Sequence, residues 1–447
     1  MVKFIKEKFY NLTKNEFFKH VITLVSGTSI AQFIPILISP LLTRLYSPED
    51  FSILGIYISA SVILSEVVTG KFELAIMNTD NKDEKTNVIS LTVIVISFFS
   101  LFFGILFFIF LEKIPFFNFS EKGYWNYLLI PTVFFLGITK LFTFTNIKKR
   151  QYKLISVSKV GRSIVQSTLQ LSLYLLKYLG LILGFFISSI VEAILLLKGN
   201  KKFIQRIEYS VAKATIKRYI KFPLFDMPSS LFNIGTIQAP ILLIPSYFGS
   251  VYGGLYFHAY KVLMTPISIM GGAIGQVFFE QGSLLKNDPK AFSNLVFKTH
   301  KQLFFLSFIP LTLLFVFGEE IFSFVFGDEW KVAGNYASAI IPWAFFNFLV
   351  SPITFIITIK EKQQIGFVFL CIMSALRLVA LLLGILYFKD SYITIMLFSC
   401  ISAISYFSYA TFMIHNYTTI NILKYWSIVI FYALPFYLAV ISLKYFL

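Results

Sequence analysis

Runs of about 20 apolar residues constrain this chain more than any other feature of its sequence. A helix needs about 20 such residues to cross a bilayer, because lipid offers no partner to an unpaired backbone polar group. Thirteen runs follow one another, at residues 21–42, 51–70, 88–111, 127–147, 155–176, 179–197, 222–247, 251–279, 303–317, 336–359, 365–388, 392–415 and 425–446. The sequence therefore predicts an all-α, polytopic integral membrane protein with about 12–13 transmembrane helices.

The composition excludes an ordinary soluble enzyme. Only 14% of the residues are charged, where globular chains carry roughly 25%. The excess of basic over acidic residues is typical of cytoplasmic loops and contact with anionic membrane lipids, so we expect no nucleic-acid partner. Cys371 and Cys400 lie in apolar runs without nearby ligand residues, which indicates packing and no metal site. No phosphate-binding loop is present in the sequence, and we expect no cofactor.

The basic residues also predict the orientation and the division of the chain. If the N-terminus is cytoplasmic, the loops on that side hold 27 Lys and Arg residues and the opposite side holds 7. We predict a cytoplasmic amphipathic segment at 1–20, a six-helix lobe at 21–198, and a basic cytoplasmic linker at 199–221. A second, pseudo-repeated six-helix lobe is predicted at 222–415 and an additional helix at 416–447.

Five bases fall well inside the predicted helices, away from their ends: Lys140, Lys159, Arg162, Lys261 and Arg377. A charge at membrane depth is costly, so it should face a water-filled cavity or a partner. On the fifth run Gln166 and Gln170 continue the face of Lys159 and Arg162 at helical spacing. We interpret these seven residues as a cationic substrate-binding cavity. Snorkelling of the two fifth-run bases, and packing by the polar uncharged residues, are the alternatives.

The acidic residues predict an anionic cargo. Glu66, Glu192, Asp226 and Glu280 are expected near the cytoplasmic ends of their helices, which leaves the middle of the membrane with bases and no acid. A cationic path favours an anion over a cation. His258 is interpreted either as a proton-coupling group or as a packing residue. Trp330, in the most acidic predicted external loop, is expected at the membrane interface or in contact with sugars.

Six short stretches carry a resemblance to a known family. They are residues 40–51 (PLLTRLYSPEDF), 72–76 (FELAI), 148–150 (KKR), 222–228 (FPLFDMP), 254–256 (GLY) and 327–334 (GDEWKVAG). The chain resembles the polysaccharide flippases of the multidrug/oligosaccharidyl-lipid/polysaccharide exporter superfamily, which move O-antigen or capsule repeat units.

The resemblance implies two six-helix lobes that form a V around a central cavity. It also implies a cargo of undecaprenyl-diphosphate-linked oligosaccharide in the bacterial inner membrane, contact with membrane lipids, and a polysaccharide polymerase and chain-length regulator as partners. Asp226, His258 and Arg44 become the candidates for ion coupling or gating. The resembling proteins are transporters and not enzymes.

Two other functions remain open from the sequence. A multidrug or cation antiporter of the same superfamily would share the fold, and a membrane-embedded polysaccharide polymerase or ligase would share the composition. The lack of a mid-membrane acid argues against the antiporter, and the lack of a long external loop argues against the polymerase or ligase.

Overall fold

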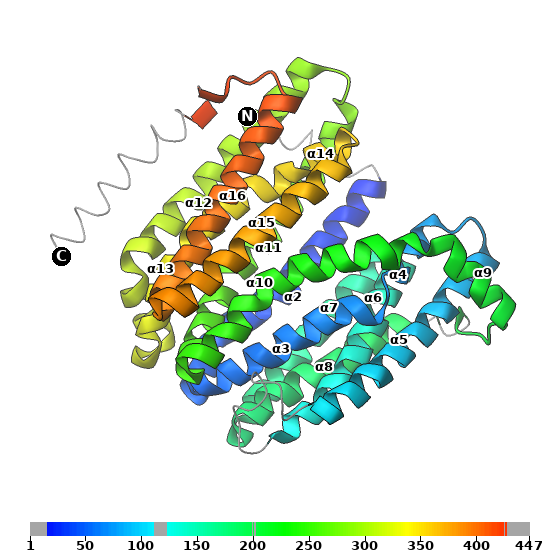
Figure 1. Ribbon diagram of the computed structural model, residues 1–447, viewed down its shortest axis with the longest axis horizontal. Coiled ribbons are helices and arrows are strands. Elements are labelled where there is room, and N and C mark those ends of the chain that lie inside the picture. The colour runs from blue at the N-terminus through cyan, green and yellow to red at the C-terminus, as the bar shows by residue number, and fades with distance from the viewer. Residues whose placement is uncertain (1–15, 111–122, 199, 201–202, 424, 427–447) are drawn as a thin grey trace. The chain divides into compact units, whose positions relative to one another are not determined.

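The protein is described here by a computed structural model that places residues 16–110, 123–198, 200, 203–423 and 425–426. These residues form helices joined by short connections, with no strand among them (Figure 1). Eleven helical segments in this part of the chain are long and apolar enough to cross a membrane. The prediction of an all-α, multi-pass membrane protein is confirmed.

The eleven segments agree closely with the apolar runs. They are Ser26–Leu45, Pro48–Val68, Lys82–Leu106, Asn126–Lys148, Tyr178–Leu197, Phe222–Phe248, Ser250–Leu284, Pro289–Phe326, Asp328–Ile359, Gln363–Phe388 and Ser391–Tyr417. The fifth run corresponds to α7 (Tyr152–Ser172), a helix of 21 residues whose polar face makes it less apolar than the others. The predicted thirteenth helix lies almost entirely outside the described residues.

The ninth run differs most from its helix. The sequence predicts residues 303–317, whereas α12 extends over Pro289–Phe326. Lys298 and Lys301 end the apolar run but not the helix, because both side chains are exposed and leave the backbone hydrogen bonds intact. A break in helical geometry does occur at Phe317, inside the same helix.

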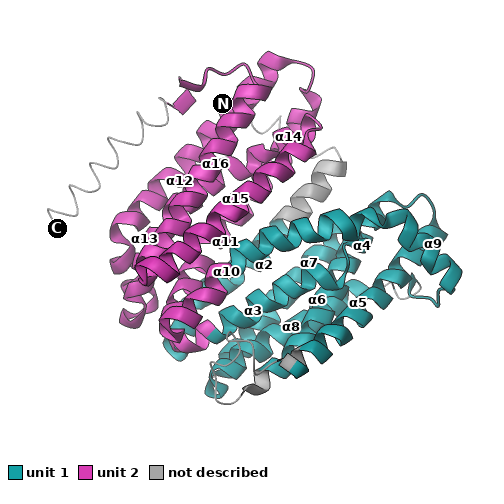
Figure 2. Cartoon of the chain, in the orientation of Figure 1, with its two compact units in different colours: residues 1–46, 53–238 teal, residues 47–52, 239–447 magenta. Residues whose placement is uncertain are grey.

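The chain forms two compact units, which Figure 2 distinguishes by colour. Unit 1 comprises Met1–Tyr46 and Ile53–Gln238, and unit 2 comprises Ser47–Ser52 and Ala239–Leu447. The division therefore falls inside α10 (Met227–Phe248), next to Pro240, and not in the basic segment at 199–221. The first residues of α3 (Pro48–Val68) belong to unit 2, although the rest of that helix belongs to unit 1.

In unit 1, α7 packs against α2 (Glu16–Leu45) and α8 (Tyr178–Leu197), and α6 (Leu129–Lys148) packs against α8 and α5 (Lys82–Phe110). Two short helices, α4 (Phe72–Ala75) and η1 (Ile76–Asn78), connect α3 to α5. The remaining short elements are η4 (Gly123–Leu128), η5 (Tyr174–Leu176), α9 (Tyr209–Tyr219) and η7 (Phe222–Asp226). The basic segment predicted as a linker thus contains a helix, α9.

In unit 2, α13 (Lys331–Val350) packs against α12, α11 (Ser250–Leu284) and α16 (Ser391–Tyr417), and α15 (Gln363–Leu383) packs against α16. The shorter elements are η8 (Asp328–Trp330), η9 (Ser351–Thr354), α14 (Phe355–Ile359) and η10 (Gly384–Phe388). The seventh apolar run contains four prolines, at positions 223, 228, 240 and 245, each of which removes a backbone hydrogen-bond donor. The structure has a π-helical turn around Pro223 and then continuous α-helix through Pro240 and Pro245, so the interruption is confined to the start.

Candidate functional site

Arg162 on α7 forms an ion pair with Glu192 on α8. The Arg162 Nη1 to Glu192 Oε2 distance is 2.7 Å, and the guanidinium also lies over the Phe185 ring, 5.0 Å from its centroid. The Glu192 side chain is only 4% exposed, so its charge is compensated by this arginine and not by water. A base at membrane depth is expected to face either a water-filled cavity or a partner, and Arg162 has a partner in Glu192.

The two glutamines of the same helix face pack against α8. Gln170 donates from Nε2 to the Leu181 carbonyl oxygen at 3.0 Å, and a Cβ on Gly184 would lie 2.6 Å from the Gln170 side chain. Gln166 is also buried. Glycine at 184 therefore allows the two helices to approach closely, and the polar face is used at least in part for helix packing.

Lys159 has weaker contacts than its neighbour on α7. Its Nζ lies 3.4 Å from the Thr28 hydroxyl on α2, and it forms no ion pair with any residue that the structure describes. The side chain is half-buried. Of the two bases that the sequence places on this helix, Lys159 is the one that lacks a carboxylate partner.

Lys140 and Lys71 share one acid. Glu66 on α3 contacts Lys140 of α6 through one carboxylate oxygen and Lys71, just before α4, through the other. Lys71 adopts a left-handed backbone conformation (φ 58°), which is uncommon for a residue with a side chain. Lys140 therefore also has an acidic partner, which the packing of α3 and α6, far apart in sequence, brings to it.

Glu73 is a buried acid that the sequence analysis did not select. It lies on α4, in the connection between the spans of α3 and α5, and is 2% exposed. Burial raises the pKa of its carboxyl, although Thr69 and the two nearby lysines oppose that rise. One carboxylate oxygen has no hydrogen-bond partner among the described residues. Its position in the resembling stretch 72–76 was the only signal for it in the sequence.

Arg377 on α15 is the most buried base, at 1% exposure. Its Nε donates to the Ser402 hydroxyl of α16 at 3.0 Å. The guanidinium carbon lies over the rings of Tyr406 and Trp343, 5.1 Å and 5.7 Å from their centroids. Within the described part of the chain no carboxylate forms an ion pair with it.

Lys261 on α11 is half-buried and has no ion pair or hydrogen bond from its ammonium group to a described residue. His258, one turn earlier, is fully buried among four aromatic rings: Phe51, Phe322, Phe326 and Trp330. Neither ring nitrogen of His258 has a hydrogen-bond partner among the described residues. The histidine is thus enclosed by apolar groups, which resembles a packing position more than a solvent-accessible one.

Three of the resembling stretches meet at this histidine. Phe51 at the start of α3 lies against Trp330 with ring centroids 4.9 Å apart, and a Cβ on Gly254 would come within 1.6 Å of the Pro48 carbonyl oxygen. Trp330 is 1% exposed. The interpretation of Trp330 as an interfacial residue or a sugar contact is therefore wrong. These contacts hold the segment Ser47–Ser52 against the rest of unit 2.

The other two coupling or gating candidates are exposed. Asp226, at the end of η7, and Arg44, in the last turn of α2, both face outward from their helices and form no ion pair with a described residue. No group of three or more His, Cys, Asp or Glu side chains is placed to hold a metal ion in the part of the chain that the structure covers.

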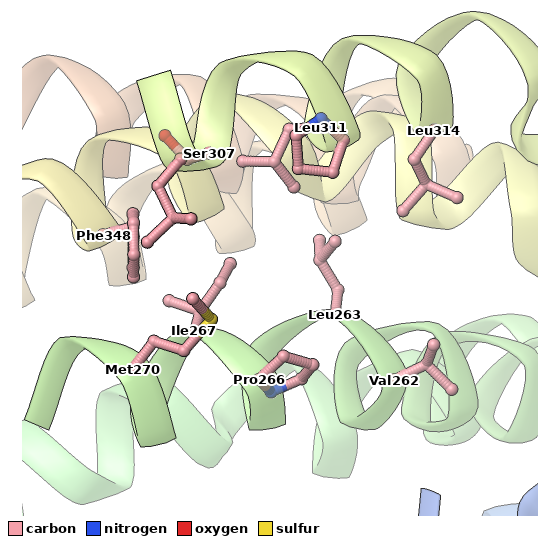
Figure 3. A pocket seen from close by; sticks show the side chains of 11 residues that line it. Val262, Leu263, Pro266, Ile267, Met270, Ser307, Leu311, Leu314 and Phe348 are labelled. Atoms are coloured by element: carbon pink, nitrogen blue, oxygen red, sulfur yellow. The ribbon is translucent and has the colours of Figure 1, made fainter. Parts of the chain in front are cut away.

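A cavity of about 210 Å³ lies in unit 2 between α11, α12 and α13 (Figure 3). Leu263, Pro266 and Ile267 of α11 face Leu311 and Leu314 of α12 across it. Ser307 is the polar residue of its lining, and its hydroxyl donates a hydrogen bond to the Leu303 carbonyl oxygen of the same helix. This cavity suits hydrocarbon and offers no partner to a charged group.

The sequence profile of the family described as "Polysaccharide biosynthesis protein" matches residues 41–335. Comparison with curated protein sequences gives no match.

Solved structures with a similar fold are transporters. The lipid II flippase MurJ in an inward closed conformation is 16% identical, with a TM-score of 0.70 over 94% of this chain and 98% of that one. An inward-facing multidrug resistance MATE family transporter of the MOP superfamily is 11% identical, with a TM-score of 0.61 over 91% and 95%. A MOP superfamily transporter from Pyrococcus furiosus is 12% identical, with a TM-score of 0.58 over 89% and 96%. At these identities the likeness shows the fold alone.

Proposed function

This chain belongs to the polysaccharide biosynthesis protein family and has the fold of MOP-superfamily transporters, and from this we propose that it flips undecaprenyl-diphosphate-linked oligosaccharides across the bacterial inner membrane. The N-terminus would be cytoplasmic, as the distribution of basic residues predicts. The product would be a repeat unit for O-antigen, capsule or exopolysaccharide synthesis. A polysaccharide polymerase and a chain-length regulator would be its partners.

The observation that carries the proposal is the uneven pairing of intramembrane charge. Lys159 and Lys261 are half-buried bases that form no ion pair with a described residue, although Lys159 interacts electrostatically with the Glu192 carboxylate that Arg162 binds. An ammonium group in a low-dielectric setting is stabilised by an anion, and a diphosphate head group is strongly anionic. These two lysines are therefore the proposed contacts of the cargo head group, with Gln166 and Gln170 beside Lys159 as secondary polar groups.

The paired bases would contribute differently. Lys140 and Arg162 are held by Glu66 and Glu192, so each would act on the cargo only by partly releasing its acid. Asp226 and Arg44 are exposed and remain the proposed coupling or gating groups, whereas the enclosure of His258 gives it the weakest case of the three.

A multidrug or cation antiporter is the second candidate, because MATE transporters share the fold. Such a protein needs an acid that is free to meet an organic cation. Glu66 and Glu192 each face a base already, and the free oxygen of Glu73 is enclosed in the α4 connection. Asp226 has no ion pair to a described residue, but it lies at the start of its span and not in the middle. Charge pairing therefore favours the anionic cargo.

Reconstituted transfer distinguishes these functions. Proteoliposomes containing the protein would be loaded with a fluorescent undecaprenyl-diphosphate oligosaccharide, and the label accessible to a membrane-impermeant quencher would be followed over time. We expect faster transfer than in protein-free vesicles, and no uptake of an organic cation dye under a pH or sodium gradient. Dye uptake without transfer of the lipid would establish the antiporter instead. Growth of the glycan chain would establish a polymerase.

A further inference from the structure

Arg377 lies near the middle of a span and has an unusual set of neighbours. It contacts Ser402 and Tyr406 on α16 and Trp343 on α13, all in unit 2, and Ser374 lies one turn earlier on the same face of α15. The ring of Tyr260 on α11 stacks on the ring of Trp343, with centroids 5.8 Å apart. We refer to Arg377, Ser374 and Trp343 as the Arg377 cluster.

The charge of Arg377 has no protein counter-charge. A guanidinium group does not lose its proton in proteins, so this residue cannot become neutral as a buried lysine can. No carboxylate is within ion-pair distance among the described residues. The two aromatic rings offset part of the cost of burying the charge, but less than the full cost of a bare charge in the membrane.

The cluster also has three unused hydrogen-bond donors. Arg377 Nη2, Trp343 Nε1 and the Ser374 hydroxyl are all buried, and none has a hydrogen-bond partner among the described residues. The three side chains are 1%, 3% and 0% exposed. An indole N–H and a guanidinium N–H can only donate, so an acceptor is the missing group. A positive charge surrounded by unused donors is the chemistry of an anion site.

The burial of the Arg377 cluster limits the size of the anion that it can bind. Arg377 is closed in by two rings and by its bond to Ser402, whereas a sugar diphosphate needs a wide, polar opening. We propose that the Arg377 cluster binds one small inorganic monoanion, with chloride as the physiological ligand, inside unit 2. This differs from the sequence-based expectation that Arg377 contacts the cargo. The anion would neutralise the arginine and join α15 to α13, independently of what the protein transports.

Bromide quenching of Trp343 tests the proposal in the full-length, detergent-purified protein. Sodium bromide would replace sodium gluconate at constant ionic strength, and the signal from Trp343 would be the difference between the wild type and Trp343→Phe. We expect a saturable quench that chloride reverses. Arg377→Gln should abolish the saturable component, and Ser374→Ala should raise the half-saturating concentration about threefold to tenfold, as for one neutral hydrogen bond.

Three controls keep the result interpretable. Lys301→Gln, which removes an exposed base from α12 of the same unit, should leave the quench unchanged. Arg377→Lys should recover saturable quenching, which a variant that failed only in folding would not show. In thermal unfolding, chloride in place of gluconate should raise the Tm of the wild type but not of Arg377→Gln.

A quench that only rises linearly with bromide, or one that survives in Arg377→Gln, would overturn the proposal. Displacement of bromide by phosphate and not by chloride would also overturn it.

Discussion

The two units treat buried positive charge in different ways. Unit 1 provides an acid for three of its bases, Glu192 for Arg162 and Glu66 for both Lys140 and Lys71, and leaves Lys159 without an ion pair among the described residues. In unit 2 the two intramembrane bases, Arg377 and Lys261, have no acid among the described residues. A paired charge contributes to the packing of its own helices, whereas an unpaired one is available to a ligand. From this comparison we propose that the paired bases serve folding and that the unpaired bases serve binding.

The largest effect is expected when a pair in unit 1 is broken. Arg162→Gln leaves the carboxylate of Glu192 buried without a counter-charge, which should lower the free energy of unfolding by about 3–5 kcal/mol. Adding Glu192→Gln should recover most of that loss, because neither charge then remains. Denaturant unfolding of the two single variants and the double variant measures the coupling. Equal stability of Arg162→Gln and the wild type would show that the pair contributes nothing.

A smaller effect is expected at the unpaired arginine of unit 2. Arg377→Gln removes a hydrogen bond to Ser402 and two ring contacts but leaves no acid behind, so in gluconate it should cost about 1–3 kcal/mol. The same unfolding measurement applies. A loss as large as that of Arg162→Gln would mean that an acid compensates Arg377 after all, and the contrast between the units would fail.

Glu73, a buried acid of unit 1 with one carboxylate oxygen that has no described hydrogen-bond partner, makes the stability of the protein depend on pH. Because burial raises the pKa of Glu73, the folded protein holds this proton more tightly than the unfolded chain does. Stability from this group is therefore lost as the pH rises above the ordinary value of about 4.5. Glu73→Gln should be more stable than the wild type by about 1 kcal/mol at pH 8 and no more stable at pH 4. A difference that does not vary with pH would contradict this.

The smallest effect is expected at His258. Its nitrogens are unpaired and its ring is enclosed by aromatic side chains, so His258→Phe exchanges one planar ring for another without breaking a hydrogen bond. We expect a change in unfolding free energy within about 1 kcal/mol and unchanged transfer of the lipid. Loss of transfer in a stable variant would restore His258 as a coupling group.

The sequence predicted the transmembrane helices well because the length and apolarity of a span are local properties. The start of α12 was missed because Lys298 and Lys301 end the apolar run on an exposed face that the helix tolerates. The ion pairs were missed for a different reason. Glu66 and Lys140 are separated by 74 residues, and only the packing of α3 against neighbouring elements shows that they meet. The spacing of Lys159, Arg162, Gln166 and Gln170 gave their common face but not what that face contacts.

Transfer of the lipid-diphosphate oligosaccharide by a variant without the two unpaired lysines tests the central claim most directly. Lys159→Gln and Lys261→Gln would be combined and compared with Lys298→Gln, an exposed base, in proteoliposomes with equal amounts of folded protein. If these lysines bind the head group, the double variant should transfer the lipid at least about tenfold more slowly, the range of a lost charge-assisted hydrogen bond, and Lys298→Gln should match the wild type. Transfer at the wild-type rate by the double variant would contradict the assignment of unpaired bases to an anionic cargo.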